Sequence, residues 1–410
     1  MDAGGILART ITLVRHAETV SNISGTWQGQ TDSPLSDRGR LQIERLRDRM
    51  DGHGAALLVM SDLGRTRTTG EAIGIGEPLA AWREFDLGAW DGMRPADIRD
   101  RYPEVDRVRF GSGDFQPDGG ERFSDFRVRV RGAFDTVAAR LDDADHAIVV
   151  THGGVIQTIV GSLVGAADQS MILVPSNASL TTVLLDGDGV QVSVFNDDLH
   201  LDGGVVRPPG TRLRLVRHAQ TEANREHRWF GRGETSLTDE GYRQAAALGR
   251  AMGPLDAIVS SPSSRAIDTA TAVATRQGLG ITIVDDLAEF DFGGWEGLTV
   301  AEIRSTDPNG FRRIHEEGFD EPRGRTGETF SGTGGRIALA AADLAAGGTG
   351  TIGVFTHGGA TRAYVAGMLG IPFADREVLP VPRNTAYSEV ISGDGGPRLS
   401  SYNVAGHLKT

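Results

Sequence analysis

The chain has 410 residues, no cysteine and a formal net charge of −13 at pH 7. This length suits two domains of roughly 200 residues, and the lack of cysteine excludes disulfides, thiolate metal sites and a cysteine nucleophile. The acidic balance argues against a broad nucleic-acid surface, and no apolar run reaches the roughly 18 residues that span a bilayer. No basic region precedes an apolar core at the start, so a secretory signal is not expected. Together these features predict a cytoplasmic protein with no membrane or nucleic-acid partner.

The first predicted strand, Ile11–Val14, is followed directly by Arg15 and His16. Its β-branched, apolar residues are typical of a buried strand. A periodic apolar pattern then predicts an amphipathic helix over Asp37–Met50, with Asp37 as its N-cap. The arginine and the histidine are therefore expected at the carboxyl end of a strand.

The next predicted elements place further charged side chains. Leu57–Met60 predicts a second buried strand, and Arg65 lies at the start of the helix that follows it. Glu84 lies in the turn "EFDLG", and the periodic stretch Glu121–Leu141 predicts a long amphipathic helix. This places Arg65 at the same edge of the sheet as the first arginine.

His152 follows the predicted strand Ile148–Val150 and opens a helix. The glycines Gly153 and Gly154 after it let a ligand approach backbone N–H groups at the helix N-terminus, a natural place for an anion. Strands that alternate with helices predict a three-layer α/β/α fold, a mostly parallel sheet flanked by helices. In such folds the ligand site lies at the carboxyl ends of the strands.

The whole pattern occurs twice. "ITLVRHAETVSN" at Ile11–Asn22 returns as "LRLVRHAQTEAN" at Leu213–Asn224, so that His218 lies 202 positions after His16. A period this long indicates duplication of a whole domain rather than a solenoid. Glycine and proline cluster in Asp202–Arg212. We therefore expect two tandem α/β/α domains, residues 1–204 and 205–410.

Two histidines and two arginines at one sheet edge suit phosphoryl transfer. Guanidinium groups grip phosphate oxygens, a neutral imidazole can attack phosphorus, and a second imidazole can donate hydrogen bonds to the transferring oxygens. The leaving alkoxide needs a proton from a carboxylic acid, for which Glu84 and Glu289 are candidates, with Asp86 and Asp291 as second choices. The second copy supplies matching residues, Arg217, His218, Arg265 and His357, and Asp239 as the matching N-cap.

These ordered motifs resemble those of the histidine phosphatase superfamily, also called the phosphoglycerate-mutase-like family. The resemblance spans nearly all of each copy: R-H-A-x-T-x-x-N, the "PLSDRG" and "SLTDEG" segments, an arginine at a helix start, E-F-D-x-G-x-W-x-G, G-E before a long helix, and T-H-G-G. It implies that His16 and His218 are nucleophiles and that Glu84 and Glu289 are general acids. It further implies a phosphate pocket and groups that orient it, formed by Arg15, Asn22, Arg65, Glu121 and His152 in the first copy and by Arg217, Asn224, Arg265, Glu328 and His357 in the second.

The two copies differ beyond T-H-G-G. The family often has an arginine five positions after the histidine, and the second copy keeps it as Arg362, a candidate substrate contact, whereas the first copy has Gln157. The resemblance implies that the segment Phe311–Arg325 covers the second pocket. There Arg312 and Arg313 either contact substrate or belong to a salt-bridged lid. The two copies are therefore expected to differ in substrate preference.

We expect a phosphomonoester phosphatase that acts on a small phosphorylated metabolite through a phosphohistidine, with two active sites per chain. No cofactor and no metal is expected, because the arginines beside the histidines repel a cation and no carboxylates cluster at metal-ligand spacing. Two alternatives stay open: a mutase that returns the phosphoryl group to another substrate oxygen, and a chain in which one half is a non-catalytic regulatory or binding domain. The sequence does not specify the alcohol portion of the substrate or the oligomeric state.

Overall fold

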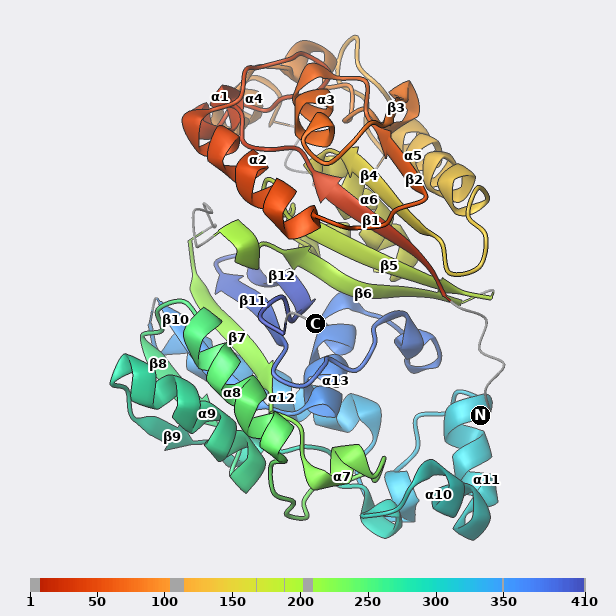
Figure 1. Cartoon of the computed structure of the whole chain (residues 1–410), viewed down its shortest axis with the longest axis vertical. Helices are drawn as coiled ribbons and strands as arrows, with labels where there is room; N and C mark the ends of the chain where they lie inside the picture. Colours follow the sequence, from red (N-terminus) through yellow and green to blue (C-terminus); the bar gives the residue numbers. More distant parts are fainter. Residues whose placement is uncertain are drawn as a thin grey trace. The chain divides into compact units, whose positions relative to one another are not determined.

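The structure, a computed structural model, describes residues 8–103, 114–166, 168–187, 189–201, 209–348 and 350–408 (Figure 1). The chain divides into two compact units, Met1–Arg207 and Pro208–Thr410, called here the first and second halves. The domain boundary predicted between residues 204 and 205 lies outside the described residues.

The first half contains a mixed sheet in the order β3-β2-β4-β1-β5-β6. Strand β4 pairs in parallel with β1 and β2, whereas β5 pairs antiparallel with β1 and β6. The strands are β1 (Arg9–Arg15), β2 (Leu57–Met60), β3 (Glu77–Pro78), β4 (His146–Thr151), β5 (Leu180–Asp186) and β6 (Gly189–Asp197). The helices are α1 (Val20–Ser24), α2 (Asp37–Met50), α3 (Gly64–Glu71), α4 (Pro95–Arg101), α5 (Phe123–Ala138) and α6 (Gly153–Leu163), with 3₁₀ turns η1 (Ala80–Trp82), η2 (Gly88–Trp90), η4 (Gln169–Met171) and η5 (Leu199–Leu201).

The second half repeats this order as β9-β8-β10-β7-β11-β12. Its strands are β7 (Thr211–Arg217), β8 (Ala257–Ser260), β9 (Ile281–Ile283), β10 (Thr351–Thr356), β11 (Tyr387–Gly393) and β12 (Gly396–Val404). Its helices are α7 (Glu222–Arg225), α8 (Asp239–Ala251), α9 (Ser264–Gln277), α10 (Val300–Thr306), α11 (Pro308–Phe311), the π-helix η8 (Arg312–Glu316), α12 (Phe330–Ala346) and α13 (Gly358–Leu369). Short 3₁₀ turns complete it: η6 (Asp285–Leu287), η7 (Gly293–Trp295), η9 (Arg323–Arg325) and η10 (Phe373–Val378).

Helices cover both faces of each sheet. In the first half, Leu46 and Met50 of α2 pack against Val14 of β1 and Ile148 of β4 in a buried apolar cluster, while α5 and α6 pack together on the other face (Figure 1). In the second half, α8 packs against α9 and α12 packs against α13. This arrangement confirms the predicted α/β fold class, since each half has helical layers around a mixed sheet.

The predicted N-caps Asp37 and Asp239 were wrong by one residue. The hydroxyl of Ser36 accepts the N–H of Gly39 at 2.9 Å and so caps α2, and Thr238 caps α8 in the same way. A hydroxyl at this position satisfies a free N–H of the first turn. The two aspartates are the first residues of their helices, where a negative charge interacts favourably with the helix dipole.

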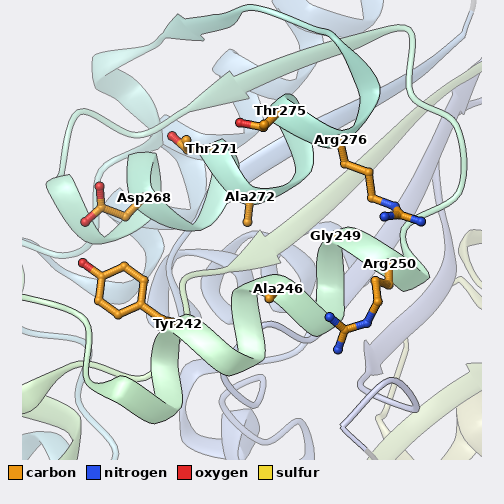
Figure 2. Close-up of a pocket in the computed structure, with 9 residues that line it drawn as sticks. All are labelled: Tyr242, Ala246, Gly249, Arg250, Asp268, Thr271, Ala272, Thr275 and Arg276. Atoms are coloured by element: carbon orange, nitrogen blue, oxygen red, sulfur yellow. The ribbon is translucent and has the colours of Figure 1, made fainter.

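A surface groove of about 610 Å³ lies between α8 and α9 (Figure 2). Arg250 and Arg276 lie toward one end of it, and Tyr242 and Asp268 lie toward the other. Its lining residues include none of the predicted site residues. Among the residues that the structure describes, no helix combines the length and apolar character needed to cross a bilayer.

Candidate active site

Two neighbouring parallel strands bring His16 and His152 together. His16 follows the last residue of β1, His152 follows the last residue of β4, and the two strands pair in register to their ends. The centroids of the two imidazole rings lie 5.3 Å apart. In the second half, β7 and β10 place His218 and His357 with the same centroid separation of 5.3 Å.

The backbone fixes the tautomer of the predicted nucleophiles. Nδ1 of His16 lies 2.8 Å from the carbonyl oxygen of Ala17, and Nδ1 of His218 lies 2.8 Å from that of Ala219. Because a carbonyl only accepts, Nδ1 carries the proton and Nε2 of a neutral ring carries the lone pair. Burial lowers the pKa of both imidazoles well below 6.5, and neighbouring guanidinium charges lower it further. Both rings are therefore neutral at pH 7 with Nε2 as the basic atom.

Arg15, which is half-buried, and Arg65, which is buried, lie beside this ring and are held by backbone carbonyls. Nη1 of Arg15 donates to the oxygen of Pro175 at 2.6 Å. Arg65 donates through Nη1 to Thr31 at 2.8 Å and through Nη2 to Gly29 at 2.6 Å. The Nε atoms of both arginines are buried and have no hydrogen-bond partner. Two oriented N–H donors are thus left for a ligand.

The second half repeats these contacts. Nη1 of Arg217 donates to Pro382 at 2.7 Å, and Arg265 donates to the carbonyls of Gly231 at 2.8 Å and Gly233 at 2.9 Å. The Nε of Arg217 is buried without a partner. Both halves therefore hold two guanidinium groups next to a neutral histidine.

A serine that the sequence analysis missed contacts the second histidine of each half. Oγ of Ser61 lies 2.9 Å from Nε2 of His152, and Oγ of Ser261 lies 2.8 Å from Nε2 of His357. Ser61 Oγ also accepts the N–H of Leu63, so its own proton is available to Nε2 and the ring proton can reside on Nδ1. Nδ1 of each histidine is buried without a partner. A serine four residues before the helix-start arginine in both copies was the available sequence signal.

Glu84 lies against the N-terminus of α6. Its Oε2 accepts the N–H of Gly154 at 2.9 Å and its Oε1 accepts the N–H of Phe85 at 2.9 Å. A Cβ on Gly154 would lie 2.5 Å from Oε1 of Glu84. The glycine therefore admits the protein's own carboxylate to the helix N-terminus, which corrects the expectation that its backbone N–H is left open for a ligand.

Glu289 occupies the same place at α13 and is held more tightly. It accepts the N–H groups of Phe290, Gly359 and Ala360 at 3.0, 3.0 and 2.8 Å, and only 7% of the residue is exposed. Burial raises the pKa of Glu289, although these three N–H groups act to lower it. A buried carboxyl group that favours its proton is suited to donate that proton to a leaving group.

Asn22 and Asn224 belong to the short helices after the nucleophile segments. Oδ1 of Asn22 accepts the N–H of Thr19, which closes a capping box at α1. It also accepts from Nδ2 of Asn177, which donates to the backbone oxygen of His16 at 3.0 Å. Asn384 makes the equivalent bonds in the second half. These bridging asparagines were missed by sequence reasoning, although P-x-N occurs at both positions.

Glu121 and Glu328 act on the candidate acids through an arginine. Glu121 pairs with Arg129, which donates to the backbone oxygens of the segment that carries Glu84. Glu328 pairs with Arg336, which binds the corresponding segment of the second half. The two glutamates thus fix the backbone behind each candidate acid.

The remaining candidates make hydrogen bonds and ion pairs outside this group. Asp86 and Asp291 each accept the N–H two residues ahead and close their own turn. Arg312 and Arg313 form ion pairs with glutamates of their own segment. Arg362 lies buried on α13, whereas Gln157 on α6 donates to a backbone carbonyl. The structure therefore groups the two arginines, two histidines and one glutamate of each half, and leaves these residues around them.

Within the described ranges, no three histidine, aspartate or glutamate side chains gather as a metal ion would require.

Both halves of the chain match the same family of known proteins. The model of the histidine phosphatase superfamily (branch 1) matches residues 11–198 and again residues 213–405. The glucosyl-3-phosphoglycerate phosphatase of Mycolicibacterium vanbaalenii is 32% identical over 200 residues, which are 45% of this chain and 88% of that protein. A probable phosphoglycerate mutase of Serratia proteamaculans is 30% identical over 167 residues, 38% of this chain and 74% of that protein.

A third relative matches a smaller share of this chain. The bifunctional protein Rv2228c of Mycobacterium tuberculosis is 44% identical over 123 residues, 29% of this chain, and the chain spans 33% of that protein's length. The two matches to one family model cover most of the sequence, and both contain the residues grouped above. The chain therefore belongs to the histidine phosphatase superfamily, with one copy of the domain in each half.

Proposed function

We propose that each half is a phosphomonoesterase that acts through a phosphohistidine. One observation carries this proposal: a neutral, buried histidine with its lone pair on Nε2 lies among buried N–H donors that have no partner in the protein. Two guanidinium groups and a second imidazole beside a nucleophile match the charge and oxygen geometry of a phosphoryl group.

In the first step, Nε2 of His16 attacks phosphorus and an N–P bond forms as the bond from phosphorus to the ester oxygen breaks. Glu84 gives its proton to the leaving oxygen, so that an alcohol departs. Arg15, Arg65 and His152 stabilise the negative charge on the transferring oxygens. His218, Glu289 and the matching pocket groups take these roles in the second half.

In the second step, water attacks the phosphohistidine. Glu84, now ionised, accepts a proton from this water as the N–P bond breaks, and inorganic phosphate and the original histidine are released. The substrate is a small phosphorylated metabolite, and we propose two sites per chain, in domains 1–204 and 205–410. The raised pKa of Glu289 supports its assignment as the acid of the second site.

The test uses the full chain with His16→Ala, His218→Ala or both, and phosphate release from p-nitrophenyl phosphate. Each single variant should retain the activity of the other site, and the double variant should retain none. Total loss from one substitution alone would show a non-catalytic half, and full activity of the double variant would exclude the phosphohistidine. Similarity to a probable phosphoglycerate mutase makes mutase activity the second candidate. Interconversion of phosphoglycerates without phosphate release would establish it.

A further inference from the structure

The second half contains three buried arginines apart from its phosphate pocket. Arg323 in η9, Arg362 in α13 and Arg376 in η10 are 5%, 7% and 6% exposed. Nε of Arg362 donates to the backbone oxygen of Arg376 at 3.1 Å. The guanidinium groups of Arg376 and Arg323 lie 3.8 and 5.0 Å from the ring centroid of Phe373. The three residues therefore form one cluster, called here the arginine cluster.

The carboxylates that face the arginine cluster balance it only in part. Asp320 pairs with Arg323 at 2.9 Å. Glu377 is shared by Arg362 at 2.9 Å and Arg376 at 3.4 Å, and its side chain is 67% exposed. An ion pair with one partner in solvent is weak, and a buried charge without full compensation is costly. Among the described residues, three guanidinium groups therefore pair with two carboxylates, which leaves room for one further negative charge.

A further polar group beside the cluster lacks a partner. Nδ1 of His315 lies 3.5 Å from Nη2 of Arg376, which can only donate, so the ring proton belongs on Nε2. That Nε2 is buried without a partner. Unpaired buried groups of this kind are uncommon in folded proteins and are expected to meet a ligand or water.

The arginine cluster lies on the side of the predicted acid. Arg323 covers the ring of Phe290, the residue after Glu289, at 5.4 Å from its centroid. Gly359, whose N–H holds Glu289, precedes Arg362 by three residues on α13, so both lie on one helix face. Because the acid protonates the leaving oxygen, the alcohol portion of the substrate lies on this side. A substituent of that alcohol would then extend toward the cluster.

The first half has no such cluster at the matching positions. Gln157 occupies the position of Arg362. Gln169 matches Arg376, because in each half the backbone oxygen of this residue accepts the N–H of the residue three positions later. The segment 114–120 contains no lysine or arginine. Where Arg323 covers Phe290, the ring of Phe115 packs against Phe85 at a centroid distance of 5.6 Å. The corresponding described region of the first half therefore lacks the three arginines and is aromatic.

We propose that Arg323, Arg362 and Arg376 bind a second anionic group, a carboxylate or a second phosphate, on the alcohol portion of the substrate of the second half. The first half then takes phosphomonoesters whose alcohol portion is uncharged. This inference rests on the proposed function, since it assigns the leaving-group side by the role of Glu289. Glu377 is the group that the anion displaces.

The full chain with His16→Ala isolates the second site, and His218→Ala isolates the first. The probes are β-glycerophosphate, with an uncharged alcohol, 3-phosphoglycerate, with a carboxylate, and fructose 1,6-bisphosphate, with a second phosphate. We expect kcat/KM of the second site to favour an anionic probe over β-glycerophosphate by about tenfold or more, the range for charge-assisted hydrogen bonds, with no such preference at the first site. The two anionic probes distinguish carboxylate from phosphate.

Failure of this inference differs from failure of the proposed function. If neither variant hydrolyses any probe or p-nitrophenyl phosphate, the phosphatase proposal is wrong. If both variants hydrolyse the probes with the same preference, the phosphatase proposal stands and the anionic subsite is refuted.

The arginines themselves are tested by Arg362→Gln, which copies Gln157, in the His16→Ala chain. We expect the preference for the anionic probe to fall about tenfold through KM, and Arg362→Lys to retain part of it. Arg276→Gln, at an exposed position on α9, is the matched control and should leave the preference intact. An equal loss for charged and uncharged probes would assign Arg362 to packing alone.

Competitive inhibition of the His16→Ala chain gives the same test without altering the cluster. Glycerate should inhibit at least about tenfold more strongly than glycerol, and equal inhibition would overturn the proposal.

Discussion

The carboxylate of Glu289 accepts the backbone N–H of Gly359 at 3.0 Å, in the first turn of the helix that begins after His357. This bond ties the predicted acid to the strand-to-helix turn that also carries one of the pocket histidines. Hydrogen bonds from this turn lower the pKa of the carboxyl, but burial is the larger effect and raises it. The group is therefore held in one position while its pKa stays above the ordinary value of a glutamate.

Gly359→Ala should disable the second site. A Cβ there would lie 2.7 Å from Oε1 of Glu289 and 2.8 Å from the ring of Phe290, so the carboxylate must move. In the His16→Ala chain we expect kcat for 3-phosphoglycerate, whose alcohol needs a proton to leave, to fall by about 10²-fold, because general acid catalysis contributes at least that much. Gly367→Ala in the same helix is the control, since nothing lies within 4 Å of its Cβ. Equal activity of the two variants would contradict the assigned role.

Glu289→Gln in the His16→Ala chain should separate the two chemical steps. p-Nitrophenolate leaves without needing a proton, so the phosphohistidine still forms, but no carboxylate remains to activate water. Rapid mixing should show a burst of about one p-nitrophenol per site, followed by turnover slowed about 10²-fold or more. The same substitution in a chain that also lacks His218 should give no burst. Steady turnover at the original rate would exclude Glu289 as the base of the second step.

The pH dependence of the second site follows from two shifts of opposite direction. His218 must be neutral, and its pKa lies well below 6.5, so acid does not inactivate the nucleophile until the pH is low. Glu289 must be protonated, and its pKa is raised above 4.5, so kcat/KM falls as the pH rises through that raised value. The profile of the His16→Ala chain should therefore fall on the alkaline side. An alkaline limb that persists unchanged in Glu289→Gln would assign it to another group.

Ser61→Ala should weaken phosphate binding at the first site. The substitution removes the partner of Nε2 of His152 and with it the bond that favours a proton on Nδ1. In the His218→Ala chain, the inhibition constant of inorganic phosphate should rise about tenfold, the scale of one lost hydrogen bond to a buried polar group. Ser24→Ala, at an exposed serine of α1, is the matched control. An unchanged constant would show that the serine does not position His152.

The sequence was most informative where a functional residue directly follows a predicted strand. Arg15 and His16 could be placed because an apolar run predicts a buried strand, and parallel strands end at one edge of a sheet. The helix over Asp37–Met50 was also predictable, but its cap was not, since Ser36 and Asp37 are both good capping residues. Only the geometry shows which of the two oxygens meets the free N–H.

Pairing across long sequence distances was not predictable. The glycines after His152 indicated an anion at a helix N-terminus, but not that the side chain of Glu84, seventy residues earlier, occupies this place. The link from Ser61 to His152 spans 91 residues. Neither has a local signature, because a hydrogen bond of this kind depends on how strands and helices pack and not on spacing.

The sequence by itself determined the duplication, the α/β class of each half and the side chains that gather at each strand edge, because these depend on local periodicity and on repeated letters. The tertiary structure decided which nitrogen of His16 is basic, which group occupies the N-terminus of α6 and how far the two halves differ around Gln157 and Arg362. These features depend on carbonyl directions, burial and neighbouring charge, which the chain acquires only when its distant segments pack together.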